Sequence, residues 1–257
     1  MTKQAGFSLL ELLLVLTISS LFLFSLYQLF FHQQQQYVDQ QVLLQSQENS
    51  RLAAHLLKNQ MQFAGEAGCG SLANLILVDH ISHHPRAIYE KNNKIYIEKA
   101  SYERANLSQV MMDIFDPIYI QQEDLFAEDD IVLISDCTYA DLFQIKQIKN
   151  NVQGQILYHT GLSRTYTQNA QIMRWQVDSF YVTTHKTAQD KFTLFQKTVL
   201  PDKPAIELVE KLDDWQVQYA LLANNSPQFL SAEEVQQWAD VRGIIINHFN
   251  IIFYNAQ

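Results

Sequence analysis

The chain has 257 residues, which is enough for one large domain or two small ones; 47% of the residues are hydrophobic and 18% are charged. This composition excludes intrinsic disorder over most of the length, and the presence of only seven glycines excludes collagen-like and glycine-rich architectures. A formal net charge of −9 removes the main driving force for non-specific binding to nucleic acid, so we expect no nucleic-acid partner.

The amino-terminal segment is strongly apolar. From Phe7 to Phe31, Leu, Phe, Ile and Val dominate, and Glu11 is the only charged side chain. About 25 residues, at a rise of 1.5 Å each, are long enough to cross a hydrocarbon core of about 30 Å. The run is too long for a cleaved secretory signal, whose apolar region has about 7–15 residues. A plain membrane anchor fits the length but leaves Glu11 unexplained, because a carboxylate at the centre of a membrane helix costs about 2.5–3.5 kcal/mol.

The residues before and after Gly6 account for this acid. Gly6-Phe7-Ser8-Leu9-Leu10-Glu11 resembles the signal of type IV prepilins. The resemblance implies that residues 1–6 are a leader, that a prepilin peptidase cuts between Gly6 and Phe7, and that the new amino terminus of Phe7 is methylated. It also implies that Glu11 neutralises the Phe7 amino group of a neighbouring subunit, which supplies the partner that a carboxylate in lipid needs. Lys3 is consistent with a cytoplasmic amino terminus and a body outside the membrane.

A long helix is expected next, because Pro and Gly are absent between Phe7 and Ala64. One α-helix of about 58 residues would be roughly 85 Å long. We expect residues 7–31 to be its transmembrane half and residues 32–64 its amphipathic, glutamine-rich half, ending at Gly65. Apolar residues near its end recur at helical spacing and should face a globular domain: Leu52, Ala53, Leu56, Leu57, Met61 and Ala64.

Beyond the helix the hydrophobic period changes, which predicts a β-rich globular domain over residues 65–257. Ser231 and Glu234 form a capping-box pattern, which predicts a short helix over residues 232–238. The expected class is α+β, with a pilin-like, long protruding amino-terminal helix packed on an antiparallel β-sheet. Strands are expected over residues 94–98, 131–134, 142–145, 155–159, 172–184, 192–199, 206–222 and 241–254.

Within the prepilins, the chain resembles the PilW family of minor pilins. The similarity rests on the stretch from Arg51 to Gly68-Cys69, on residues 135–145, and on later runs at 179–182, 207–219 and 238–242. It implies a structural, non-catalytic subunit that primes or caps a type IV pilus, as in twitching motility. The implied partners are the prepilin peptidase, other minor pilins, the major pilin and the inner-membrane assembly platform, with a tip adhesin as a further candidate. The implied location is a single pass in the inner membrane with a periplasmic body, and the pilus tip after assembly.

The two cysteines, Cys69 and Cys137, are the only ones in the chain. An exported body lies in an oxidising compartment, so we expect a Cys69–Cys137 disulfide, while two reduced buried thiols remain the alternative. Closing a loop of about 70 residues stabilises the fold by up to about 4 kcal/mol.

We expect no metal, no cofactor and no catalytic site. The run from Gly68 to Ala73 fits a dinucleotide-binding pattern, but it follows a helix rather than a strand. Two other functions stay open: a minor pseudopilin of type II secretion, of the GspJ kind, and an anchored periplasmic binding module that never polymerises. Asp79, His80, His83 and His84 are dense enough to be considered as metal ligands, but two of the histidines precede Pro85 in what reads as an exposed loop, so we expect solvated turn residues. A calcium site has no loop spacing or turn glycine to support it in the second group, which we expect to be a solvated connection: Glu123, Asp124, Glu128, Asp129 and Asp130.

Overall fold

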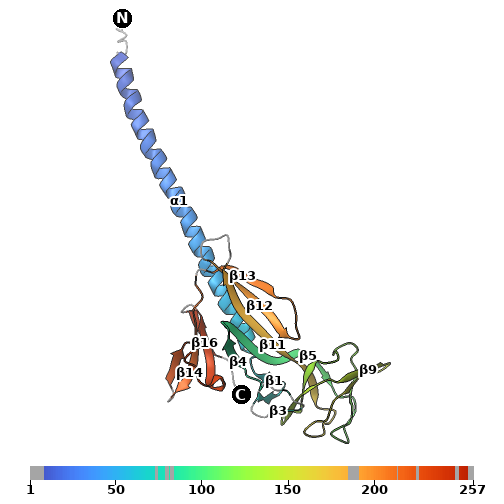
Figure 1. The fold of residues 1–257 in the computed structure, drawn as a ribbon. Helices are drawn as coiled ribbons and strands as arrows, with labels where there is room; N and C mark the ends of the chain where they lie inside the picture. Colours follow the sequence, from blue (N-terminus) through green and yellow to red (C-terminus); the bar gives the residue numbers. More distant parts are fainter. Residues whose placement is uncertain are drawn as a thin grey trace. The chain divides into compact units, whose positions relative to one another are not determined.

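The computed structural model describes residues 9–72, 75–78, 81, 84–184, 191–212, 214–223, 226–246 and 249–253. The chain divides into two compact units, Met1–Glu48 and Asn49–Gln257. The boundary falls within helix α1, Leu9–Met61, which is the only α-helix in the described residues (Figure 1). The second unit, which we call the body, is made mostly of β-sheet, so the expected α+β class is confirmed.

Helix α1 forms where the sequence lacks Pro and Gly and is rich in Leu and Gln, which are good helix formers. The predicted continuous helix is confirmed from Leu9, but it ends at Met61, four residues before the expected stop at Gly65. Residues 62–65 form turns instead, and Gly65 has a left-handed φ of 76°. A Cβ atom at Gly65 would lie 2.9 Å from Cβ of Ala87, so the chain reverses close to the first strands of the body.

The main sheet of the body has eight strands in the described residues. Its central strand is β11, Gln171–Thr184, which pairs with β5, Lys94–Asn106, and β12, Phe192–Leu200. The antiparallel prediction is right for every pair of this sheet except one, because β3 runs parallel to β8. The remaining strands of the sheet are β3 (Leu75–Leu77), β4 (Ile88–Lys91), β7 (Ile131–Ser135), β8 (Ala140–Gln144) and β13 (Ile206–Leu212).

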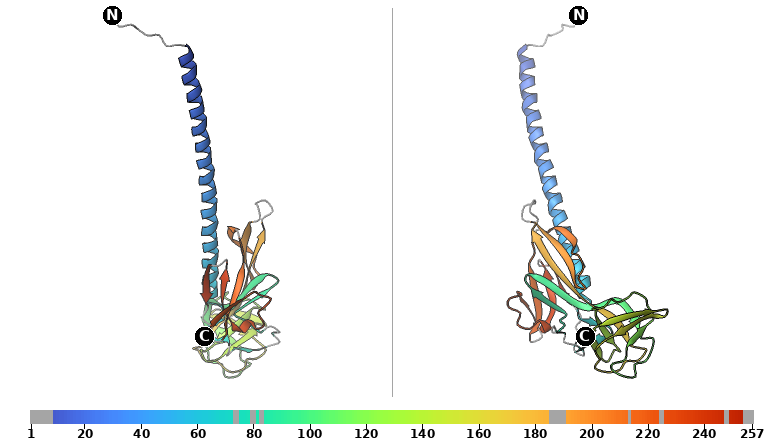
Figure 2. Two further views of the ribbon diagram at one scale, coloured as in Figure 1. Left: turned by 90° about the vertical axis from the view of Figure 1, so that its left-hand side faces the viewer. Right: turned by 45° about the vertical axis from the view of Figure 1, so that its right-hand side comes forward.

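Three smaller sheets complete the described body. A four-stranded sheet has the order β15-β14-β16-β17, a three-stranded sheet the order β6-β10-β9, and β1 pairs with β2. Figure 2 shows the four-stranded sheet (red) and the three-stranded sheet (yellow-green) at different ends of the body. Their strands are β1 (Glu66–Ala67), β2 (Gly70–Ser71), β6 (Ile118–Ile120), β9 (Gln147–Asn151), β10 (Gly154–Tyr158), β14 (Val217–Ala223), β15 (Ser226–Leu230), β16 (Val241–Ile246) and β17 (Phe249–Phe253).

Two runs that were each predicted to be one strand are two strands in the structure. The run 206–222 is two strands in different sheets, β13 and β14, because Lys211 takes a left-handed φ of 56° near the end of β13. The run 241–254 is a hairpin of β16 and β17 rather than one closing strand. The other predicted strands are confirmed, with ends that differ by a few residues, except that β5 continues to Asn106.

The predicted helix over residues 232–238 is also wrong. One of the two capping-box bonds forms, since the backbone N–H of Ser231 donates to Oε2 of Glu234 at 2.8 Å; the Ser231 hydroxyl donates to the same oxygen at 2.9 Å, and the backbone N–H of Glu234 donates to the carbonyl of Ser231 instead of the hydroxyl. They organise a single turn, which is followed by the 3-10 helix η2, Trp238–Asp240. So short a segment gains too little from helical hydrogen bonds to offset the cost of nucleation, and its apolar side chains Val235 and Trp238 pack into the core instead.

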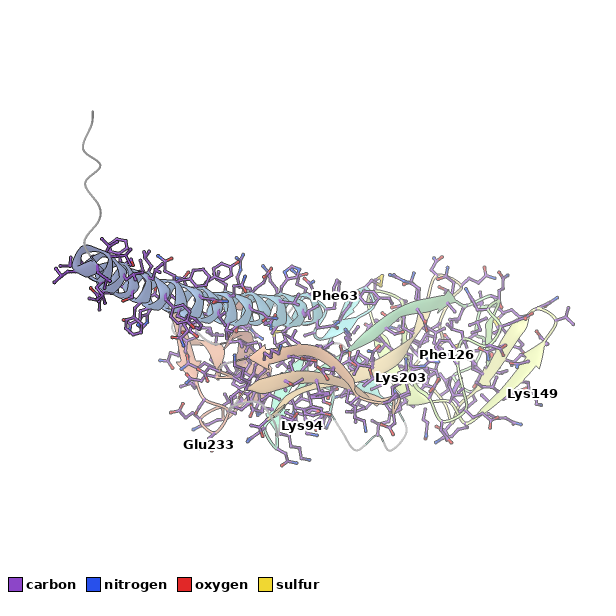
Figure 3. All side chains as sticks on the ribbon, turned by 90° about the horizontal axis from the view of Figure 1, so that it is seen from above. Phe63, Lys94, Phe126, Lys149, Lys203 and Glu233 are labelled. Atoms are coloured by element: carbon purple, nitrogen blue, oxygen red, sulfur yellow. A yellow bond between two sulfur atoms is a disulfide. The ribbon has the colours of Figure 1, made fainter. Side chains whose placement is uncertain are left out.

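The end of α1 packs into the largest core cluster of the body. The buried helix residues Ala53, Leu57 and Met61, with Ala64 just beyond the helix end, recur every three to four positions and belong to one cluster with apolar side chains from β5, β11 and β16. The prediction that Leu52 faces the body is wrong, because Leu52 is 47% exposed and lies to one side of this stripe. A second cluster includes Phe126, which Figure 3 shows between Phe63 and Lys149.

Candidate functional site

The predicted cleavage site lies outside the described residues. Gly6 and Phe7 both precede Leu9, the first described residue, and of Glu11 only the helical backbone is described. The cleavage, the methylation and the pairing of Glu11 with the amino group of Phe7 therefore stay predictions.

The amino-terminal half of α1 is covered with apolar side chains that the described chain leaves exposed. They include nearly all the large apolar residues from Leu9 to Phe31. By length and composition this helix can cross a membrane. Apolar surface of this extent in water is unfavourable, so it requires lipid or other helices around it.

Four hydroxyl groups within this apolar segment have partners on the helix itself. Thr17, Ser19, Ser20 and Ser25 each donate to a backbone carbonyl three or four residues earlier, at 2.9–3.0 Å. Such bonds satisfy polar groups that lipid cannot solvate. Glu11 is the one charged side chain of this segment in the sequence, and the structure describes only its backbone.

The carboxyl-terminal end of α1 is held in the body by polar contacts as well as by the core. The amide of Asn49 donates to the backbone carbonyl of Glu210 on β13, at 2.9 Å. Nearer the helix end, the ammonium of Lys99 on β5 donates to the side-chain oxygen of Gln60. Lys99 also lies 3.7 Å from the carboxylate of Asp178 on β11. These contacts tie the end of the helix to three strands of the main sheet.

The Lys99–Asp178 pair is almost completely buried. Burial lowers the pKa of the Lys99 ammonium, and the nearby Asp178 carboxylate opposes this shift. Asp178 in turn accepts hydrogen bonds from the hydroxyl of Thr198 and the amide of Gln176, both at 2.7 Å. Every charge in this network thus has a hydrogen-bonding partner, as a buried charge requires.

A sequence signal for this network exists, although we did not predict it. Asp178 lies within a run that otherwise predicts a largely buried strand, and a charge at such a position demands an opposite charge nearby; Lys99 directly follows the predicted strand 94–98. The pattern does not reveal which residues pair.

The predicted disulfide between Cys69 and Cys137 is present, with the two Cα atoms 4.6 Å apart. It connects the segment that follows α1 to the turn between β7 and β8. In that turn, Asp136 Oδ1 accepts hydrogen bonds from the backbone N–H groups of Thr138 and Tyr139, at 3.1 and 2.9 Å. The alternative of two reduced, buried thiols is wrong, because the cysteines are bonded and exposed.

The acidic segment near residue 128 has structural contacts in the described body. Asp130 forms a salt bridge with Arg174 on β11, with Oδ2 and Nε 2.9 Å apart, and Glu128 accepts from the backbone N–H of Ile148. In the part of the chain that is described, no group of three or more His, Cys, Asp or Glu side chains is arranged to hold a metal ion. Asp79, His80 and His83 lie outside the described residues.

Comparison with known families identifies the amino-terminal motif. The family described as the prokaryotic N-terminal methylation motif matches residues 1–27. No curated protein sequence and no solved structure matches the chain. The motif indicates the precursor of a type IV pilin-like protein or pseudopilin, which is a class of structural subunits. It implies processing by a prepilin peptidase and assembly with other pilins, and the apolar helix is compatible with a single-pass inner-membrane anchor.

Proposed function

We propose that this protein is a minor pilin of the PilW type, which primes or caps a type IV pilus in a tip complex with other minor pilins. The methylation motif at residues 1–27, joined without a break to the exposed apolar surface of α1, carries the proposal. Cleavage after Gly6 leaves this helix in place and creates a new amino terminus at Phe7. Lipid covers the helix before assembly, and the helices of other subunits cover it afterwards.

Glu11 provides the electrostatic part of this mechanism. Its carboxylate is costly in hydrocarbon unless a positive group lies beside it. In the proposed assembly step, the amino group of Phe7 on one subunit neutralises Glu11 of the adjacent subunit as that subunit leaves the bilayer. The sequence supports this role, because Glu11 is the only charged residue between Phe7 and Phe31.

The contacts at the end of α1 support a mechanical role. Leu57 and Met61 are fully buried in the core, and Gln60 is bonded to Lys99 of the main sheet. A force applied along the end of the helix is therefore passed to the body through packed side chains and a buried polar network. Such a connection suits a subunit that is pulled out of a membrane by its helix.

In the proposed orientation the amino terminus is cytoplasmic and the body is periplasmic. Lys3 on the leader supports this orientation, and so does the Cys69–Cys137 disulfide, because disulfides persist in oxidising compartments. The proposed partners are the prepilin peptidase, other minor pilins, the major pilin and the inner-membrane assembly platform, with a tip adhesin as a further candidate.

The experiment is Glu11→Ala expressed at native level in the parent organism, with Glu48→Ala as the matched control. Glu48 is an exposed acid on the same helix, beyond the apolar segment. Both variants are expected to insert in the membrane and to yield methylated Phe7 by mass spectrometry. Only Glu11→Ala is expected to abolish surface fibres.

The same samples separate the alternatives. Normal fibres with Glu11→Ala would contradict the proposal. An amino terminus that remains at Met1 would instead support an anchored binding module. A deletion that abolishes protein secretion and leaves surface fibres intact would favour a type II secretion pseudopilin.

A further inference from the structure

The loop of residues 108–117, which connects β5 to β6, displays apolar side chains on the surface of the body. Met112 is 86% exposed and Phe115 is 64% exposed, and Val110 is exposed nearby in the sequence. Their neighbours Met111 and Ile118 are buried in the second core cluster, so the loop is anchored at both ends. Large apolar side chains at this level of exposure are a known mark of interaction sites.

Hydrogen bonds within the loop fix its shape. The carboxylate of Asp116 accepts from the backbone N–H groups of Met112 and Asp113, at 2.7 and 2.8 Å. Asp113 Oδ1 accepts from the backbone N–H of Phe115 at 2.9 Å. Because the loop backbone is already ordered, binding of a partner does not include the entropic cost of ordering it.

Contacts with the underlying chain also hold the loop in place. The backbone N–H of Leu162 donates to the carbonyl of Ile114 at 2.9 Å, and Nε2 of His159 lies 2.9 Å from the carbonyl of Asp116. A Cβ atom on Gly161 would lie only 2.7 Å from the ring of Phe115, so the ring rests directly on glycine backbone. The exposure of Phe115 therefore belongs to an ordered loop rather than to a frayed one.

The stretch of chain that contains the loop is acidic, and two acids, Asp113 and Asp116, belong to the loop itself. Residues 104–170 contain nine Asp and Glu against four Lys and Arg, a net charge of −5 out of the −9 of the whole chain. Within the described residues, neither Asp113 nor Asp116 forms a salt bridge with a lysine or arginine. Negative charge beside an apolar patch favours a positively charged partner and disfavours an anionic lipid surface.

We propose that the 108–117 loop is a docking element for a protein partner that presents an apolar pocket bordered by Lys or Arg. Phe115 and Met112 enter the pocket, and Asp113 faces its basic border. Aromatic residues and methionine are enriched in protein interfaces. This assignment does not depend on the role of α1 in fibre assembly.

The experiment places the photo-crosslinking residue p-benzoylphenylalanine at position 112 of the full-length protein in living cells. Position 152 is the control, because Val152 is 98% exposed but lies in the two-residue turn between β9 and β10. The expected result is an adduct of discrete protein mass at position 112, at least about tenfold more abundant than at position 152. The crosslinked partner peptide is expected to contain apolar residues flanked by Lys or Arg.

Two further substitutions test the two parts of the proposal. Phe115→Ser removes the apolar anchor, and Asp113→Asn removes the charge while keeping the Oδ1 acceptor for Phe115. Each is expected to lower the yield of the adduct at position 112 by about tenfold. A second design places the crosslinker at position 110 and uses Met112→Ser in place of Phe115→Ser. Met112→Ser is expected to lower the yield of the adduct at position 110 by about tenfold.

Adducts of lipid mass alone, equal yields at positions 112 and 152, or yields unchanged by both substitutions would overturn the proposal. Near-ultraviolet circular dichroism and an intact Cys69–Cys137 disulfide establish that each variant is folded. The mature amino terminus is measured in the same samples. A chain that keeps Met1 contradicts the pilin function, and the crosslinking pattern is scored separately from that result.

Discussion

The ammonium of Lys99 lies 3.7 Å from the carboxylate of Asp178, and both side chains are almost fully buried in the body. The same ammonium donates to Gln60 in the last turn of α1. This ion pair therefore has two effects: it neutralises two buried charges, and it bonds the helix end to the main sheet. Removing one partner leaves the other charge buried without compensation, which costs more than the pair itself contributes.

Asp178→Ala is therefore expected to lower the free energy of unfolding by about 3–5 kcal/mol, because Lys99 loses its counter-charge. The measurement is urea unfolding of the full-length protein in detergent. Asp202→Ala is the matched control, since Asp202 pairs with Lys197 at 3.0 Å on the surface. Exposed pairs contribute less than about 1 kcal/mol. Equal losses in the two variants would contradict a structural role for the buried pair.

The buried pair also predicts a dependence on pH. Burial lowers the pKa of Lys99 below its ordinary value of 10.5. Between that lowered pKa and 10.5 the unfolded chain binds more protons than the folded chain, so the Lys99 contribution to stability rises as the pH rises. In Asp178→Ala this interval begins at a lower pH, because the carboxylate that opposes the shift is gone. The difference in the free energy of unfolding between the wild type and Asp178→Ala is thus expected to shrink as the pH rises.

Urea midpoints of the wild type and of Asp178→Ala, measured from about pH 7 to about pH 10, test this expectation. Lys99→Met is the control, because it removes the titrating group and keeps a long apolar stem. Lys99→Met and the double variant Lys99→Met with Asp178→Ala are therefore expected to show the same dependence of the urea midpoint on pH. A constant gap between wild type and Asp178→Ala over the whole range would show that Lys99 does not titrate as described.

The helix end offers a comparison between two leucines. Leu57 is completely buried in the core cluster, whereas Leu52, five residues earlier, is 47% exposed. Leu57→Ala is expected to lower the free energy of unfolding by about 2–5 kcal/mol through lost burial and a cavity. Leu52→Ala is expected to change it by about 0.5 kcal/mol or less. Similar losses in urea unfolding would mean that the helix end is not packed as described.

Long elements could be predicted from the sequence. Helix α1 is predicted because Pro and Gly are absent over its length, and the strands β11 and β12 each have enough residues for a strand-like run to be seen. The short strands β3 and β6 have three residues each, and their extended state is set by pairing with β8 and β10. Local patterns carry little information about such contacts.

The candidate site was predictable in part for a similar reason. The prepilin motif is local, within residues 1–27, and only two cysteines were available for a disulfide. The network of Gln60, Lys99 and Asp178 joins residues far apart in the chain, and the exposure of Phe115 depends on how a loop is held by its surroundings. Such relationships follow from tertiary packing, which no local pattern contains.

The disulfide gives the last prediction. Replacing both cysteines, Cys69→Ser with Cys137→Ser, is expected to lower the free energy of unfolding by up to about 4 kcal/mol, because a bond across 68 residues of chain restricts the unfolded state. The measurement is again urea unfolding of the full-length protein in detergent, with and without a reducing agent. Both cysteines are exposed, so the reductant has access to the bond in the folded protein.

Reduction of the wild type is expected to bring its urea midpoint close to that of the double variant. The double variant, which has no disulfide, is expected to show the same midpoint with and without reductant. If the reductant shifts both proteins equally, its effect does not act through the bond. If it shifts neither, the connection between the segment after α1 and the β7–β8 turn does not contribute to the stability of the body.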